Sequence, residues 1–121
     1  MLQKYPEYEQ EVKVPEKVWP LRIWYMYDQD VCTLIDVNER ERKVKIKNYT
    51  DKIMFRAFGV MEEPDYNQYI EFLESRCFPE SRDKMKLILK DLGLPFYDPI
   101  MIIEKTEGRM AEDDFWIRIE R

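Results

Sequence analysis

The chain has 121 residues, 37% of them charged, with a net charge of −5 and no histidine. This length is enough for one hydrophobic core, so the chain is not expected to need a metal ion or a disulfide bond to fold. The absence of histidine excludes His general bases, Ser–His and Cys–His nucleophiles and His-ligated zinc, and with them most common hydrolase mechanisms.

The first twenty residues combine prolines with charged and aromatic side chains and lack the apolar stretch of a signal peptide. Prolines favour extended backbone. We therefore expect residues 1–20 to form an extended arm that docks through Tyr5, Tyr8 and Trp19, within a single domain of residues 1–121. Without a signal peptide or an apolar run long enough to span a membrane, we expect a cytoplasmic protein and no membrane partner.

Two runs of aromatic and β-branched residues, 22–28 and 31–37, follow the arm. This composition is typical of strands, and the two residues between the runs, Gln29 and Asp30, have the length of a hairpin turn. Strict alternation over residues 43–47 then places two apolar side chains on one face and three lysines on the other. The sequence thus predicts a hairpin followed by a half-buried antiparallel strand.

Two further segments are strand candidates. The run KIMFRAF at 52–58 fits either a strand or a short helix, and we favour the strand. Residues 115–119 alternate, which predicts a final strand that rejoins the sheet with Phe115, Ile117 and Ile119 facing inward.

Apolar residues recur at spacings of three and four in two segments, 65–76 and 81–92, and a third, short helix is expected at 98–107. Each segment begins with a residue that favours a helix N-terminus: Asp65, Ser81 and Asp98, the last followed by a proline. Strands before helices, with one returning strand, predict an α+β fold. We expect an antiparallel sheet of about four or five strands, from residues 21–58 and 115–119, packed against two or three helices.

Basic side chains are concentrated around the third predicted strand. They are Arg40, Arg42, Lys43, Lys45, Lys47 and Lys52. Lysines on one strand face repeat at about 6.6 Å, near the spacing of phosphates, so this face could contact nucleic acid or another anion. We favour the alternative that they keep an outer sheet face hydrated and unpaired, because the chain is acidic and no base-stacking pattern accompanies them.

An acidic cluster follows in the first predicted helix and the residues before it. Its members are Glu62, Glu63, Asp65, Glu71 and Glu74. Such a cluster could imitate a nucleic-acid backbone and occupy a basic channel of a partner. Acidic residues at helical spacing are more often a solvated face, and we favour that interpretation.

Neither the thiols nor the carboxylates form a catalytic pattern. We expect Cys32 and Cys77 to be buried thiols and not a disulfide. The only two serines, Ser75 and Ser81, lack a nucleophile motif, and the acidic run 112–114 is of a kind common in polar turns without a ligand. We therefore expect no catalytic residue, no metal, no cofactor and no enzymatic activity.

The most distinctive text lies at 75–82 (SRCFPESR), 92–93 (LG) and 108–118 (GRMAEDDFWIR). It resembles a segment near the N-terminus of HipA-like kinase-related proteins. In that segment a Ser-Arg pair, a proline and a second arginine open a helix, and a glycine is followed by an Asp and a Trp-Ile pair. The resemblance covers less than half of the chain and does not imply kinase activity, because the phosphate-binding loop and the catalytic Asp/Asn loop are missing.

The resemblance implies a small partner or regulator of a HipA-type toxin kinase, from a mobile element or toxin–antitoxin locus. The partner-binding candidates are Arg76, Arg82, Asp114 and Trp116. These residues also have a structural alternative, because Asp114 could pair with one of the two arginines and join the helix junction to the final strand.

We therefore predict a non-enzymatic protein that acts by binding another protein. Two other classes stay open. The first is a mobile-element-encoded inhibitor of the anti-CRISPR type, whose acidic surface blocks a nucleic-acid-binding nuclease. The second is a nucleic-acid-binding module that uses the basic strand face.

Overall fold

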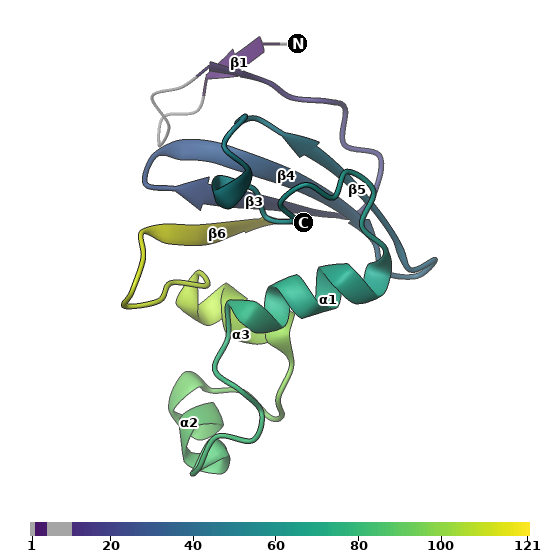
Figure 1. Cartoon of the computed structure of the whole chain (residues 1–121). Coiled ribbons are helices and arrows are strands. Elements are labelled where there is room, and N and C mark those ends of the chain that lie inside the picture. Colours follow the sequence, from purple (N-terminus) through teal and green to yellow (C-terminus); the bar gives the residue numbers. More distant parts are fainter. Residues whose placement is uncertain (1, 5–10) are drawn as a thin grey trace.

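The computed structural model describes residues 2–4 and 11–121 and confirms the α+β fold class (Figure 1). A four-stranded antiparallel sheet lies in the middle, the helices lie below it in this view, and a small two-stranded sheet lies above it. The docking expected of Tyr5 and Tyr8 lies outside the described residues.

The central sheet has the spatial order β5-β4-β3-β6, and all of its neighbouring strands are antiparallel. Its strands are β3 (Leu21–Tyr27), β4 (Asp30–Asn38), β5 (Lys43–Asn48) and β6 (Phe115–Glu120), while β1 (Leu2–Lys4) and β2 (Glu11–Lys13) form the small sheet. The last strand of the chain thus lies beside β3, as the alternation over residues 115–119 predicts.

The hairpin between β3 and β4 turns at Asp28 and Gln29, one residue earlier than predicted. Asp28 has a φ of 52°. Asp adopts this left-handed conformation more readily than most residues, so it takes the place of the Asn-Gly pair that commonly forms such turns.

The strand predicted at 52–58 is wrong. Ile53–Phe55 instead form a 3₁₀ helix, η1. Apolar side chains are consecutive here and do not alternate, and the ring of Phe55 packs 4.7 Å from that of Tyr27, centroid to centroid. Turning the backbone brings Phe55 onto the helix-side face of the sheet, which a strand continuing along β5 would not do.

The three α-helices of the described residues are α1 (Tyr66–Ser75), α2 (Met85–Leu92) and α3 (Pro99–Thr106). Asp65 and Gln68 form a reciprocal capping box at the start of α1, and Asp98 caps α3 ahead of the proline. The N-termini predicted for these two helices are confirmed.

Helix α2 begins later than predicted and is not capped by Ser81. The residue before it is Lys84, which has a left-handed φ of 60° and no side-chain cap. The preceding residues are used by a turn in which Arg82 N–H donates to the Pro79 carbonyl at 3.0 Å. The serine therefore lies in a turn, while the predicted stop at Gly93 is confirmed.

The sheet is buried on both faces over much of its area. The helix-side face packs Ile23, Ile35 and Ile117 against α1 and α3, which contribute Leu73 and Ile102 among others. The arm-side face holds a second, smaller cluster of Trp24, Met26, Val31 and Leu34, against which Val14, Tyr49 and Trp116 pack. The chain that precedes β3 thus covers the second face (Figure 1).

Candidate functional site

Arg76, just after α1, is held entirely by groups of the chain itself. Its guanidinium donates two hydrogen bonds of 3.0 Å to the carboxylate of Asp113, one of 2.9 Å to the Gly108 carbonyl and one of 3.0 Å to the Phe115 carbonyl. Its side chain is only 7% exposed. Arg76 therefore joins α1 to the approach to β6 and is not available to a partner.

The pairing predicted for Asp114 is wrong, since Asp113 is the acid that pairs with Arg76. Asp113 also accepts the Phe115 N–H at 3.1 Å, which turns its carboxylate inward. Asp114 is exposed, and its backbone carbonyl accepts the Asp28 N–H. Hydrogen bonding to the arginine lowers the pKa of Asp113 below its ordinary value of 3.8.

The remaining partner-binding candidates lie around one corner of the molecule. Arg82 lines a hollow of about 340 Å³, and Asp114 and Trp116 line an adjacent one of about 440 Å³. Both hollows include Arg109 and Met110, and the Arg109 guanidinium lies 4.9 Å from the Trp116 ring centroid. The structure thus brings the two distinctive segments together. Arg109 and Met110 belong to the distinctive segment 108–118 but were not among the predicted site residues.

The basic residues in and around β5 do not form one open face. The Nζ atom of Lys45 lies 4.4 Å from the ring centroid of Trp19, and Lys47 donates to the Lys13 carbonyl at 3.1 Å. The chain before β3 therefore engages both lysines. Tyr49 also donates to the Lys13 carbonyl, which holds the arm in the same place.

The other basic candidates point to different surroundings. Arg42 lies over the ring of Tyr66, and Lys52 lies over the ring of Phe55. Lys43 is exposed and pairs with Glu41 at 3.2 Å, and Arg40 is exposed. These contacts divide the basic run among the arm, the helix side and solvent.

All five members of the acidic cluster are exposed. They are Glu62, Glu63, Asp65, Glu71 and Glu74. Asp65 also caps the N-terminus of α1, because its carboxylate accepts the Gln68 N–H at 2.8 Å. Glu62 and Glu63 directly follow a part of the surface that carries several exposed apolar side chains.

That part of the surface consists of Ile53, Met54, Val60 and Met61, which we call the apolar patch. Their exposed fractions are 50%, 84%, 74% and 37%. A Cβ atom at Gly59 would lie 3.7 Å from the Ile53 side chain, so the backbone next to Val60 passes close to Ile53. The strand predicted at residues 52–58 would have buried half of these side chains, so the patch does not follow from the sequence prediction. Consecutive apolar residues without alternation were the available signal.

The thiols and tyrosines of the core offer little chemistry. Cys32 and Cys77 are buried and free, as expected. Burial raises the pKa of Cys32 to about 11 and of Cys77 to about 12, so both are protonated at neutral pH and weakly nucleophilic. Burial likewise raises the pKa of Tyr25 to about 12.

Within residues 2–4 and 11–121, no group of three or more cysteine or carboxylate side chains is arranged to hold a metal ion. No helix in the same part of the chain is long and apolar enough to cross a bilayer.

Comparison with known proteins gives no match to a family model, a curated protein or a solved structure. The fold and surface therefore define the class by themselves: a small α+β protein with an exposed apolar patch beside two acidic residues.

Proposed function

We propose that this protein acts by binding another protein through the apolar patch. The observation that carries the proposal is the exposure of Ile53, Met54, Val60 and Met61 within nine consecutive positions. Exposed apolar area costs about 25 cal/mol per Å² relative to buried area, so neighbouring exposed side chains mark a surface that gains stability when covered.

The backbone that carries the apolar patch is fixed before any partner arrives. Phe55 packs against Phe115 with ring centroids 5.6 Å apart, and Phe58 packs against Phe72 at 5.4 Å. Arg56 donates to the Thr50 carbonyl at 2.8 Å and closes the turn. A preformed surface loses less conformational entropy on association than a flexible loop, which favours tight binding.

The charges beside the patch indicate the chemistry of the partner. Glu62 and Glu63 follow Met61 directly, and both are exposed. A partner surface with an apolar depression and a basic rim would complement this arrangement.

The partner we propose is a HipA-type kinase, and this choice rests on the sequence resemblance. The segments 75–82 and 108–118, which carry it, meet through the Arg76–Asp113 pair. Arg82 and Asp114 are exposed at that corner, and we propose them as further contacts to such a partner. The protein would act there as a regulator or accessory subunit without catalytic chemistry of its own.

The inhibitor hypothesis remains the second candidate, because Glu62 and Glu63 would serve equally well against the basic channel of a nuclease. Nucleic-acid binding through the basic strand receives less support, since the arm already engages Lys45 and Lys47. Binding to DNA or RNA that weakens steeply with salt and disappears on charge reversal at Lys43, Lys45 and Lys47 would favour it instead.

The experiment is co-expression with a HipA-type kinase from the same genome, followed by size-exclusion chromatography. We expect a stable complex with the wild-type chain and loss of the complex with Met54→Asp/Val60→Asp. Leu87→Asp is the matched control, because Leu87 is 58% exposed but lies on α2. Separate elution of the wild-type chain and the kinase would contradict the proposed partner. A complex that tolerates the double substitution would contradict the proposed surface.

A further inference from the structure

The hydroxyl of Tyr69 is a buried polar group without a hydrogen-bond partner among the residues that the structure describes. The tyrosine lies on α1 and is only 1% exposed. Buried polar groups in folded proteins nearly always have a partner, because an unpaired group keeps the free-energy cost of leaving water. A tyrosine of this kind in the wall of a hollow is therefore a candidate contact for a ligand.

Tyr69 lines a hollow of about 230 Å³ between α1, the start of α3 and the turn after β4. Two further tyrosines, Tyr66 and Tyr97, and two acids, Glu39 and Asp98, line the same hollow. At about 30 Å³ per molecule, this volume equals about seven waters, so the hollow suits a ligand of a few non-hydrogen atoms. It shares no lining residue with the apolar patch.

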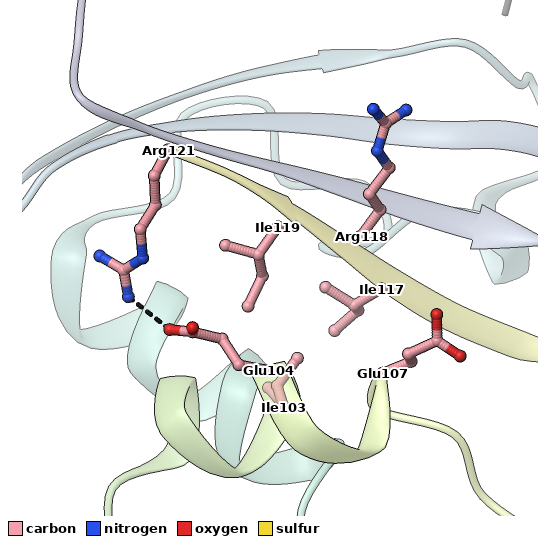
Figure 2. A pocket seen from close by; sticks show the side chains of 7 residues that line it. All are labelled: Ile103, Glu104, Glu107, Ile117, Arg118, Ile119 and Arg121. Atoms are coloured by element: carbon pink, nitrogen blue, oxygen red, sulfur yellow. Dashed lines mark hydrogen bonds and ion pairs between the residues drawn. The ribbon is translucent and has the colours of Figure 1, made fainter.

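The charges around the Tyr69 hydroxyl are mainly negative. Burial raises the pKa of the hydroxyl, and the charges of Glu39 and Asp98 raise this pKa further. Arg121 acts in the opposite direction, but its guanidinium pairs with Glu104 at the end of the groove between α3 and β6 (Figure 2). The hydroxyl therefore stays protonated at neutral pH, in surroundings that favour a positively charged neighbour.

Glu39 has a carboxylate that is free to bind such a neighbour. Glu39 is exposed and forms no ion pair with the residues that the structure describes. Asp98 is partly used, because its carboxylate caps α3 and accepts the Ile100 N–H at 3.0 Å. The Arg42 guanidinium lies 4.5 Å from the centroid of the Tyr66 ring, so one wall of the hollow already attracts a cation.

We propose that this hollow binds a small organic cation, a primary ammonium group on a short alkyl chain. An ammonium group has three N–H donors, which match the Tyr69 hydroxyl oxygen and the carboxylates of Glu39 and Asp98. The alkyl chain packs against the tyrosine rings and Ile70, which also lines the hollow. A ligand of this kind gives the Tyr69 hydroxyl the partner it lacks, whereas an anion would be repelled by the two acids.

The test is an NMR titration of the ¹⁵N-labelled chain with butylammonium chloride at constant ionic strength. We expect saturable shifts of the Tyr66, Tyr69 and Tyr97 amide signals and a dissociation constant in the millimolar range, as is usual for so small a ligand. The neutral 1-butanol and the anionic butyrate, which are of similar size, should bind about tenfold more weakly or not at all.

A second titration distinguishes two sources of the alkylammonium group, a free amine and a lysine side chain. Its probe is Nα-acetyl-lysine amide, which carries the same group beside a peptide backbone. Tighter binding than that of butylammonium assigns the hollow to a lysine side chain, and weaker binding assigns it to a free amine.

Three variants identify the contacts. Tyr69→Phe should weaken butylammonium binding about tenfold, because it removes a hydrogen bond to a charged group. Glu39→Gln should weaken it about threefold, since the carboxylate is exposed. Glu41→Gln is the matched control, because Glu41 lies two positions away and outside the lining, and it should bind as wild type does.

Circular dichroism melting shows that each variant is folded, and Tyr69→Phe is expected to fold because it removes only an unpaired group. The absence of saturable shifts with wild type up to about 100 mM butylammonium would overturn the proposal. Equal binding of 1-butanol would overturn the preference for a cation. Wild-type affinity in Tyr69→Phe would overturn the contact with the hydroxyl.

Discussion

The guanidinium of Arg76 and the carboxylate of Asp113 face each other through two hydrogen bonds of 3.0 Å and join the end of α1 to the turn before β6. The arginine is 7% exposed, whereas the carboxylate is 30% exposed. The more buried member also binds two backbone carbonyls, so the pair organises the junction of helices and sheet.

Replacing Arg76 with alanine should lower the free energy of unfolding by about 3 kcal/mol, because two carbonyls lose their donor and the acid keeps only the Phe115 N–H. The partial exposure of Asp113 keeps the loss at the lower end of the range for buried pairs. Chemical denaturation measures it. Arg82→Ala, an exposed arginine at the same junction, should change stability by no more than about 0.5 kcal/mol. Equal losses in the two variants would contradict a special role for Arg76.

The Arg76–Asp113 pair makes the free energy of unfolding depend on pH in the acidic range. The pKa of Asp113 is below 3.8 in the folded state because Arg76 hydrogen-bonds its ionised form. The contribution of the carboxylate to stability is therefore complete above the unfolded value of 3.8 and is lost as pH falls through the folded value. We expect Asp113→Asn to lose less stability than wild type between pH 4 and pH 2, as measured by urea denaturation at each pH. Parallel curves would contradict the assignment.

Gly108 and Gly93 both have positive φ, of 62° and 74°, but different surroundings. A Cβ at Gly108 would lie 3.1 Å from the Ile117 side chain, while one at Gly93 would meet nothing within 4 Å. Alanine at Gly93 should cost about 1 kcal/mol from the backbone alone, and alanine at Gly108 at least about 1 kcal/mol more. Thermal unfolding of both variants measures the difference. Equal losses of stability would show that the Ile117 side chain moves aside without a free-energy cost.

Tyr69 is almost fully buried in α1, and its hydroxyl has no hydrogen-bond partner among the residues that the structure describes. A buried hydroxyl without a partner retains its desolvation cost. Tyr69→Phe should therefore raise the free energy of unfolding by about 1 kcal/mol, as measured by chemical denaturation. A loss of similar size would mean that the hydroxyl is hydrogen-bonded in solution. Leu73→Ala, in the same helix and also buried, should show the usual large loss.

Local signals account for the parts of the fold that the sequence predicts well. Asp65, the Asp98–Pro99 pair and Gly93 each act on the backbone next to them, so the helix ends they set are readable from a few residues. Ser81 failed as a cap because the Pro79–Arg82 turn uses the same residues. That competition is not visible in spacing alone.

The surface was harder to predict because it depends on contacts between distant residues. Lys45 looks solvated in the sequence but packs against Trp19, which lies in the arm. Asp113 and Asp114 are adjacent acids, and only the fold decides which of them meets Arg76. The apolar patch likewise depends on the tertiary fold, because Phe55 packs against Tyr27 while its neighbour Met54 is left exposed.

We propose Ile53, Met54, Val60 and Met61 as a protein-binding surface. Isothermal titration of a purified HipA-type kinase with the wild-type chain, with Met54→Asp/Val60→Asp and with Leu87→Asp tests it most directly. We expect wild type and Leu87→Asp to bind with equal affinity, and the patch variant to bind at least about a hundredfold more weakly. Equal affinity for all three chains would contradict the claim.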